Sequence, residues 1–108
     1  MARKRKRKGE ILPEERWLVA VTERQVTIQN RAGIHARPAS LIVQTASRFD
    51  CHVYLSKDGT KINAKSIMGI ITLGAAYQSE LTLSADGPDE DKVVDAIAHL
   101  IETRFEEE

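Results

Sequence analysis

The sequence predicts an α+β fold, an open-faced β-sandwich in which a four-stranded, largely antiparallel sheet carries its helices on one face. Two observations predict it. Segments with alternating polar and apolar residues are interspersed with segments whose apolar residues recur at helical spacing, in the order βαββαβα. At 108 residues, the chain is long enough for one modest core and too short for two.

The first half of the chain holds a strand, a helix and a hairpin. Residues 25–29 alternate polar with β-branched apolar side chains, the pattern of a half-buried strand. From about residue 36 to about residue 49 one apolar stripe predicts a helix, with the members Pro38, Leu41, Ile42, Thr45, Ala46 and Phe49. Val53 and Leu55 then mark a strand, which a turn at Asp58-Gly59 joins to a returning strand marked by Ile62 and Ala64.

The second half adds a helix, a strand and a last helix. Residues 66–73 are predicted to form a short apolar helix that begins at Ser66. Alternation over residues 81–85 predicts the fourth strand. Residues 86–89 start the last helix, whose apolar residues follow the 3.6-residue period: Val93, Ile97, Leu100, Ile101 and Phe105.

The N-terminal extension, residues 1–23, differs in composition from the predicted domain, residues 24–108. Positions 3–8 are all Lys or Arg, a run that repels itself and cannot build a core, so residues 1–8 are predicted to be disordered. Residues 9–22 are too apolar for a linker and are expected to pack on the domain surface, as a short helix from Pro13 that runs into an extended segment. Because the formal net charge is zero, this basic tail precedes an acidic domain.

The basic tail admits three interpretations. It could contact nucleic acid or another acidic surface by neutralising phosphates, it could tether itself to the acidic domain, or it could be a dispensable solvated tail. No aromatic residues interleave with the charges to stack on bases. We therefore favour the solvated tail and do not expect nucleic acid as a partner.

Composition excludes several classes of protein. No apolar run approaches the roughly 20 residues of a membrane span, so a soluble protein without membrane insertion is expected. Basic residues follow Met1, but no apolar segment typical of a secretory signal comes after them, so we expect a cytoplasmic location. The one cysteine, Cys51, has no disulfide partner and no metal-ligand companion, and is expected to pack near the start of a strand.

His35 is the centre of the stretch where the chain turns from strand to helix, residues 30–40. Gly33 supplies backbone freedom, and a proline three residues after the histidine suits the first turn of a helix. The amides of Ala36 and Arg37, the helix macrodipole and the guanidinium would all meet an anion held against the imidazole. Imidazole can attack phosphorus, so the pattern predicts a phosphate site with a nucleophile. The alternative is a surface histidine that happens to precede a helix.

Two motifs together resemble the HPr phosphocarrier proteins of the bacterial phosphoenolpyruvate:sugar phosphotransferase system. The first, NRAGIHARPAS at residues 30–40, is similar to the family's phosphorylation-site motif. The second, KSIMGIITLG at residues 65–74, is similar to its regulatory-serine motif. The resemblance runs from about Arg24 to Phe105. It implies three helices on one side of a four-stranded sheet.

The resemblance also implies the chemistry. His35 would be phosphorylated at Nδ1 by phosphorylated enzyme I, which takes its phosphoryl group from phosphoenolpyruvate, and the group would pass to an enzyme IIA domain. Arg37 would neutralise phosphate oxygens, and the backbone of Ala36 would belong to the site. No acid/base pair or metal cluster accompanies the histidine, so we expect a phosphoryl-transfer component without cofactor or metal, not an independent catalyst.

Ser66 matches the serine that the family's HPr serine kinase/phosphorylase modifies in many bacteria, although a serine here is also a good N-cap for the helix that follows. Beside His35, the family arrangement implies a partly exposed apolar docking surface for several partners. Its residues would be Ile67, Met68 and Ile71, extended by Leu41 and Gln44. Periodicity alone would equally place the three apolar residues in the core. His52 and His99 lack motif context and are interpreted as structural.

Two other functions remain as alternatives. One is a regulatory HPr-like protein of a nitrogen- or carbon-control branch that acts by protein binding, as the Crh-type relatives do, although those lack the active histidine. The other is nucleic-acid binding through the basic tail. The long N-terminal extension, and Ala36 where many relatives carry a different small residue, are departures from the family pattern.

Overall fold

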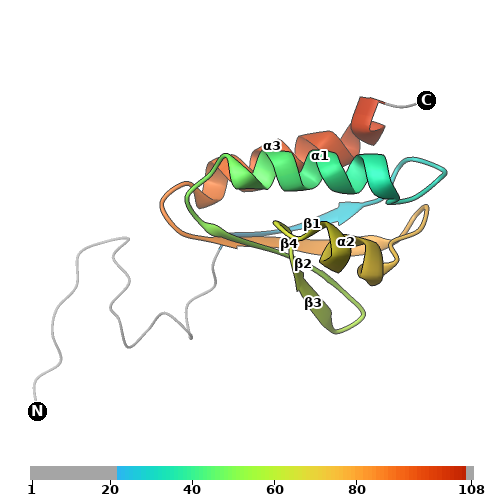
Figure 1. Cartoon of the computed structure of the whole chain (residues 1–108), viewed down its shortest axis with the longest axis horizontal. Coiled ribbons are helices and arrows are strands. Elements are labelled where there is room, and N and C mark those ends of the chain that lie inside the picture. Colours follow the sequence, from blue (N-terminus) through green and yellow to red (C-terminus); the bar gives the residue numbers. More distant parts are fainter. Residues whose placement is uncertain (1–21, 107–108) are drawn as a thin grey trace, which may run out of the picture.

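The computed structural model describes residues 22–106 (Figure 1). The expectations of a disordered tail at residues 1–8 and of a packed segment over residues 9–21 lie outside this part of the chain. Thr22, the last residue of that expected segment, opens the first strand. No helix of the described part is long and apolar enough to cross a membrane.

A single four-stranded antiparallel sheet forms the base of the domain. Its strands are β1 (Thr22–Thr27), β2 (His52–Lys57), β3 (Thr60–Asn63) and β4 (Glu80–Asp86), in the spatial order β1-β4-β2-β3. The register places Val26 opposite Leu81 and Leu55 opposite Leu83, which sets apolar side chains on one face. The β2–β3 hairpin turns at Asp58 and Gly59, whose φ angles are 50° and 84°. Positive φ at both turn residues matches the twist of the flanking strands.

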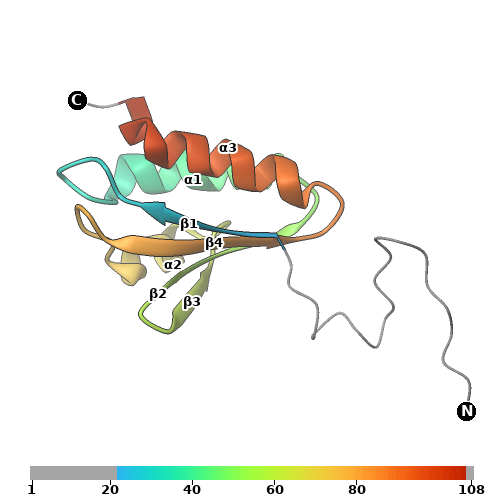
Figure 2. The same ribbon diagram turned by 180° about the vertical axis from the view of Figure 1, so that it is seen from behind.

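Three helices complete the fold: α1 (Ala36–Ser47), α2 (Ile67–Leu73) and α3 (Glu90–Glu102). Helices α1 and α3 run side by side over the sheet (Figures 1 and 2), while α2 packs against β3 and against α1. The core between these layers is aliphatic and includes Ile42, Ile97 and Ile101, all fully buried. The α+β class and the predicted element order are confirmed.

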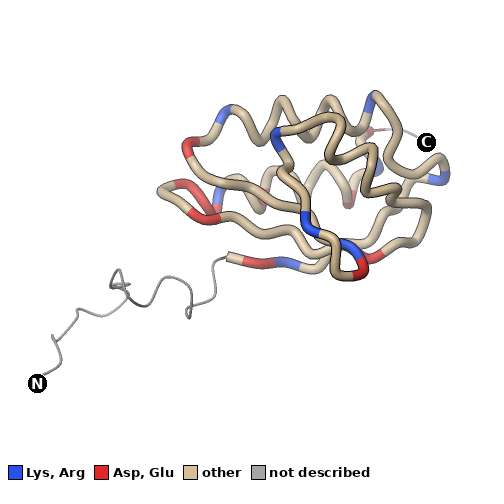
Figure 3. Tube along the Cα trace, turned by 60° about the horizontal axis from the view of Figure 1, so that its bottom comes forward, with Lys and Arg blue, Asp and Glu red and all other residues tan. Residues whose placement is uncertain are grey.

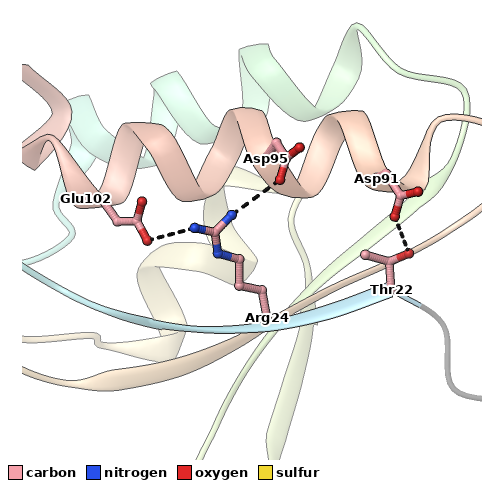
Figure 4. Close-up of polar contacts among 5 residues, drawn as sticks. All are labelled: Thr22, Arg24, Asp91, Asp95 and Glu102. Carbon is pink, nitrogen blue, oxygen red and sulfur yellow. Dashed lines mark hydrogen bonds and ion pairs between the residues drawn. The ribbon is translucent and has the colours of Figure 1, made fainter.

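The predicted first strand is displaced. It was expected over residues 25–29, but β1 spans Thr22–Thr27. The sequence pattern missed its first half because Thr22 and Arg24 are polar, yet both turn towards α3 and bind its carboxylates (Figure 4). Arg24 reaches Asp95 at 3.3 Å and Glu102 at 3.2 Å. Polar side chains thus occupy helix-facing positions where the alternation rule expects apolar ones.

Three further boundaries differ by one or two residues. Helix α1 ends at Ser47 instead of residue 49, with Arg48 as its C-cap. Ser66 is the N-cap of α2 and not its first residue. Ala64 follows β3, although its amide still donates to the carbonyl of Val53 at 2.8 Å.

Phe105 lies outside the last helix, which corrects its expected place on the α3 stripe. Helix α3 ends at Glu102, and residues Arg104–Glu106 form a separate turn, η2. The side chain of Phe105 is nevertheless fully buried. Phe105 matches the 3.6-residue apolar period of α3 only by coincidence, because a left-handed turn, and not the helix, brings it back to the core.

Cys51 lies just before β2 and is buried, as predicted from its sequence. Burial raises the pKa of its thiol, because the thiolate would lose solvation.

Candidate functional site

His35 lies at the N-cap of α1, at the tip of a tightly bonded loop. Within this loop, Asn30 Nδ2 donates to the carbonyl of Gly33 at 2.6 Å, and the Gly33 amide donates to the carbonyl of Asn30 at 3.0 Å. The amide of Ile34 donates to the carbonyl of Ala75 at 2.9 Å, which ties the loop to the segment that follows α2. His35 is exposed, and its imidazole makes no capping hydrogen bond to the helix. A fixed backbone therefore presents an imidazole at the surface.

Gly33 makes this loop geometry possible. Its φ is 73°, and a Cβ built there would lie 2.8 Å from the Ala75 carbonyl oxygen and 3.1 Å from Ala76 Cα. Only glycine adopts this conformation without steric cost and also leaves room for the facing backbone. The predicted need for backbone freedom at this position is thus explained by two effects, the positive φ and the close approach.

The first turn of α1 is suited to an anion. The amides of Ala36 and Arg37 have no acceptor within the helix, because each helical amide bonds the carbonyl four residues earlier. Pro38, the next residue, has no backbone N–H. No acidic residue lies in this turn, so no side chain of the turn competes for the positive end of the macrodipole. A phosphoryl group on His35 would be drawn to these amides.

Arg37 is exposed on the same turn and contacts the far end of the chain. Its Nη1 donates to the carbonyl oxygen of Phe105 at 3.3 Å. The sequence placed Arg37 at the site but gave no sign of this contact, because 68 residues separate the two partners. The turn η2 is therefore a neighbour of the site that sequence reasoning missed.

Ser66 is half-buried and caps α2. Its hydroxyl oxygen accepts a hydrogen bond from the Gly69 amide at 3.1 Å, and its carbonyl accepts one from the Ile70 amide at the same distance. Just before it, Lys65 Nζ donates to the carbonyl of Phe49 at 3.0 Å, which joins the start of α2 to the end of α1. The cap expected from the sequence is present in the structure.

The apolar residues of α2 divide between core and surface. Ile70 and Leu73 are buried, whereas Ile67, Met68 and Ile71 are 41%, 69% and 39% exposed. We call these last three residues the apolar patch. Periodicity had left burial open for them, and the structure exposes all three. Since the segment after α2 is bonded to Ile34, the patch lies on an element that adjoins the histidine loop.

The two α1 residues expected to extend this surface differ from each other. Gln44 is exposed, and its Nε2 donates to the Ser40 hydroxyl at 3.3 Å. Leu41 is half-buried and packs against the core, so it offers less surface to a partner.

Tyr77 is a further exposed apolar residue that the sequence analysis did not single out. It is 44% exposed and lies in the loop between α2 and β4, whose backbone contacts Gly33 and Ile34. The available signal was a large aromatic residue in a short loop of small and polar residues.

The two other histidines lie on different elements. His52 opens β2 and stacks on Tyr54, with ring centroids 6.4 Å apart, and His99 lies in the last turn of α3. Among the described residues, no group of three His, Cys, Asp or Glu side chains is arranged to hold a metal ion.

Comparison with known proteins adds a family assignment to this geometry. Residues 22–103 match the profile of the family described as "PTS HPr component phosphorylation site". The phosphocarrier protein HPr of Treponema pallidum is 53% identical over 83 residues, which are 77% of this chain and 94% of that protein. The HPr-like protein Crh of Halalkalibacterium halodurans is 43% identical, over 76% of this chain and 98% of that protein.

A solved structure agrees with these sequence relatives. The crystal structure of HPr-C-His from Thermoanaerobacter tengcongensis superposes with a TM-score of 0.78 at 48% identity. The match covers 81% of this chain and 98% of that one.

Proposed function

The chain belongs to the HPr phosphocarrier family of the phosphotransferase system, and from this premise we propose that His35 accepts a phosphoryl group from phosphorylated enzyme I and passes it to enzyme IIA domains. The observation that carries the proposal is the place of His35. It is an exposed imidazole at the N-terminus of a helix whose first turn contains an arginine and two amides that precede any intrahelical acceptor.

The transfer is an in-line displacement that needs little covalent chemistry from the protein. The imidazole Nδ1 lone pair forms a bond to phosphorus while the bond between phosphorus and the donor group breaks, and the reverse step delivers the group to the acceptor. The chain contributes position, through the bonded loop at residues 30–34, and charge stabilisation.

Charge stabilisation comes from two sources. The amides of Ala36 and Arg37 point out of the helix end, where the macrodipole favours negative charge. The Arg37 guanidinium adds a fixed positive charge with donors that match phosphate oxygens. Neither source requires a metal or a cofactor, and the proposal includes none.

Phosphorylation with purified components tests the assignment. The protein, incubated with phosphoenolpyruvate and enzyme I, is expected to form an acid-labile, base-stable phosphoryl adduct, the stability typical of a phosphohistidine. His35→Ala should abolish the adduct, while His52→Ala and His99→Ala should retain it. A phosphoryl group on His52 or His99 of the wild-type protein would refute the proposal.

Ser66 is the regulatory site of this proposal. Phosphate there adds a charge of about −1.5 to −2 at the start of α2, which the helix end tolerates but an acidic partner surface would not. The apolar patch begins at the next residue, so the charge would enter the surface on which we expect enzyme I and enzyme IIA domains to dock. An HPr serine kinase/phosphorylase would be the modifying enzyme.

A regulatory HPr-like protein that acts by binding is the second candidate. It is favoured by the similarity to Crh at 43% identity. The presence of His35 favours the carrier, and transfer from His35 to an enzyme IIA domain discriminates between the two. Both functions imply a cytoplasmic protein. A nucleic-acid contact through the basic tail is the less favoured alternative, and loss of binding on deletion of residues 1–8 would support it.

A further inference from the structure

The C-terminal turn η2 holds three consecutive residues in a conformation that side chains avoid. Arg104, Phe105 and Glu106 have φ angles of 59°, 54° and 61°, and none of them is glycine. L-residues disfavour this left-handed region because Cβ approaches the following carbonyl oxygen. Such strain persists only where the surroundings enforce it, and it is concentrated at functional sites.

The side chain of Phe105 anchors this turn in the core. Its side chain is fully buried in the common core, together with α3 residues such as Ile101. On either side, the Thr103 amide donates to the His99 carbonyl and the Glu106 amide donates to the Thr103 carbonyl, both at 3.0 Å. Burial of a phenylalanine ring is large enough to hold a short strained turn in place.

The strained turn directs one carbonyl at the candidate site. A helical continuation of α3 would point the carbonyl of residue 105 along the α3 axis. The left-handed turn instead brings it to Arg37 Nη1, at 3.3 Å. Figures 1 and 2 both show the described C-terminal end beside the start of α1. A neutral carbonyl can orient a guanidinium without itself neutralising the positive charge.

We propose that Phe105 is a positioning residue for phosphoryl transfer, which acts by holding its own carbonyl against Arg37. The anchored turn keeps the guanidinium at the N-terminal end of α1, where it meets the phosphoryl group on His35. This inference rests on the proposed function of His35, and it assigns a positioning role to a buried residue that touches no substrate.

A double-mutant cycle tests the positioning role of Phe105. The rate of phosphoryl transfer from enzyme I is measured for the wild-type protein, Phe105→Ala, Arg37→Ala and the double variant, at a temperature where all four are folded. Misplacement of a charge-stabilising group is expected to slow transfer by about tenfold in Phe105→Ala. In the Arg37→Ala background, the same substitution should have no further effect, because it acts through the guanidinium.

Two control variants separate positioning from stability. Val93→Ala removes buried volume at the other end of α3 and should lower the thermal midpoint without slowing transfer. Phe105→Leu keeps an apolar anchor and should retain most of the wild-type rate. Equal slowing by Phe105→Ala in both backgrounds, or no slowing in either, would overturn the inference. A wild-type protein that is not phosphorylated on His35 would instead refute the proposed function itself.

Discussion

Gly33 sets the distance between the histidine loop and the segment after α2. Its φ of 73° and the 2.8 Å separation that a Cβ would have from the Ala75 carbonyl oxygen make two independent demands on this residue. A side chain would have to push the two backbones apart, and the bond from the Ile34 amide to Ala75 would lengthen. Because His35 lies two residues after Gly33, the position of its imidazole depends on this contact.

We predict that Gly33→Ala lowers the free energy of unfolding by about 2–4 kcal/mol, since a strained φ and overpacking each cost about 1–3 kcal/mol. Gly59→Ala is the matched control: its φ is 84°, but nothing lies within 4 Å of the added Cβ. It should cost only the backbone strain. Denaturant unfolding measures both, and equal losses would contradict a steric role for Gly33.

The sequence predicted those site residues that are brought together by local chain geometry. His35, Ala36 and Arg37 are consecutive, so a helix start at residue 36 places them together. The bond from Arg37 to the carbonyl of Phe105 could not be predicted, because it depends on how α3 and η2 pack against α1. Tyr77 was missed because exposure of a loop residue leaves no periodic pattern in the sequence.

Helix α2 combines a cap, an apolar patch and a link to the histidine loop within a few residues. Ser66 caps the helix through the Gly69 amide, and Ile67, Met68 and Ile71 are exposed beyond it. Aspartate is also a favourable N-cap, so a negative charge can be placed at this position while the helix keeps its start.

Ser66→Asp should therefore weaken phosphorylation of His35 by enzyme I while the protein stays folded. The effect should shrink in high salt, since exposed charges are screened over about 10 Å at 0.1 M and about 3 Å at 1 M. Initial rates at both salt concentrations, with Ser66→Asn as the uncharged capping control, measure it. A loss that does not depend on salt would indicate a structural cap and not electrostatic regulation.

Strand β1 and helix α3 are joined by polar contacts at the edge of the sheet. The Thr22 amide donates to Glu90 Oε2 at 3.1 Å, and the Thr22 hydroxyl donates to the same oxygen. These bonds favour the ionised carboxylate, and the hydroxyl bond is the main reason that the pKa of Glu90 is lowered. The same polar side chains concealed the first half of β1 from the alternation pattern.

The lowered pKa gives a pH prediction. A carboxyl whose pKa is lower in the folded state stabilises the fold above its unfolded pKa of about 4.3, and this contribution is lost as the pH falls through the folded value. Thr22→Val should therefore reduce the loss of stability on acidification below about pH 4.3. Unfolding at pH 7 and pH 3 measures it, and an unchanged pH dependence would show that the contact contributes nothing.

The candidate site and an acidic loop lie at opposite ends of the molecule. His35, Arg37 and η2 gather where α1 begins, while the loop between β4 and α3 carries acidic residues at the opposite end (Figures 1 and 3). The sequence predicted the class and the element order because apolar alternation and helical periodicity report burial directly. Strand order and the return of the C-terminal turn to α1 depend on long-range packing, which those patterns do not encode.

In the proposed mechanism the phosphoryl group resides on Nδ1 of His35. Long-range ¹H–¹⁵N NMR spectra of the phosphorylated protein test it most directly, because the chain has only three imidazoles and their ring nitrogens can be assigned by substitution. We predict that a single imidazole changes, that it is absent from His35→Ala, and that its Nδ1 couples to phosphorus. Coupling at Nε2, or at a nitrogen of His52 or His99, would refute phosphorylation of His35 at Nδ1.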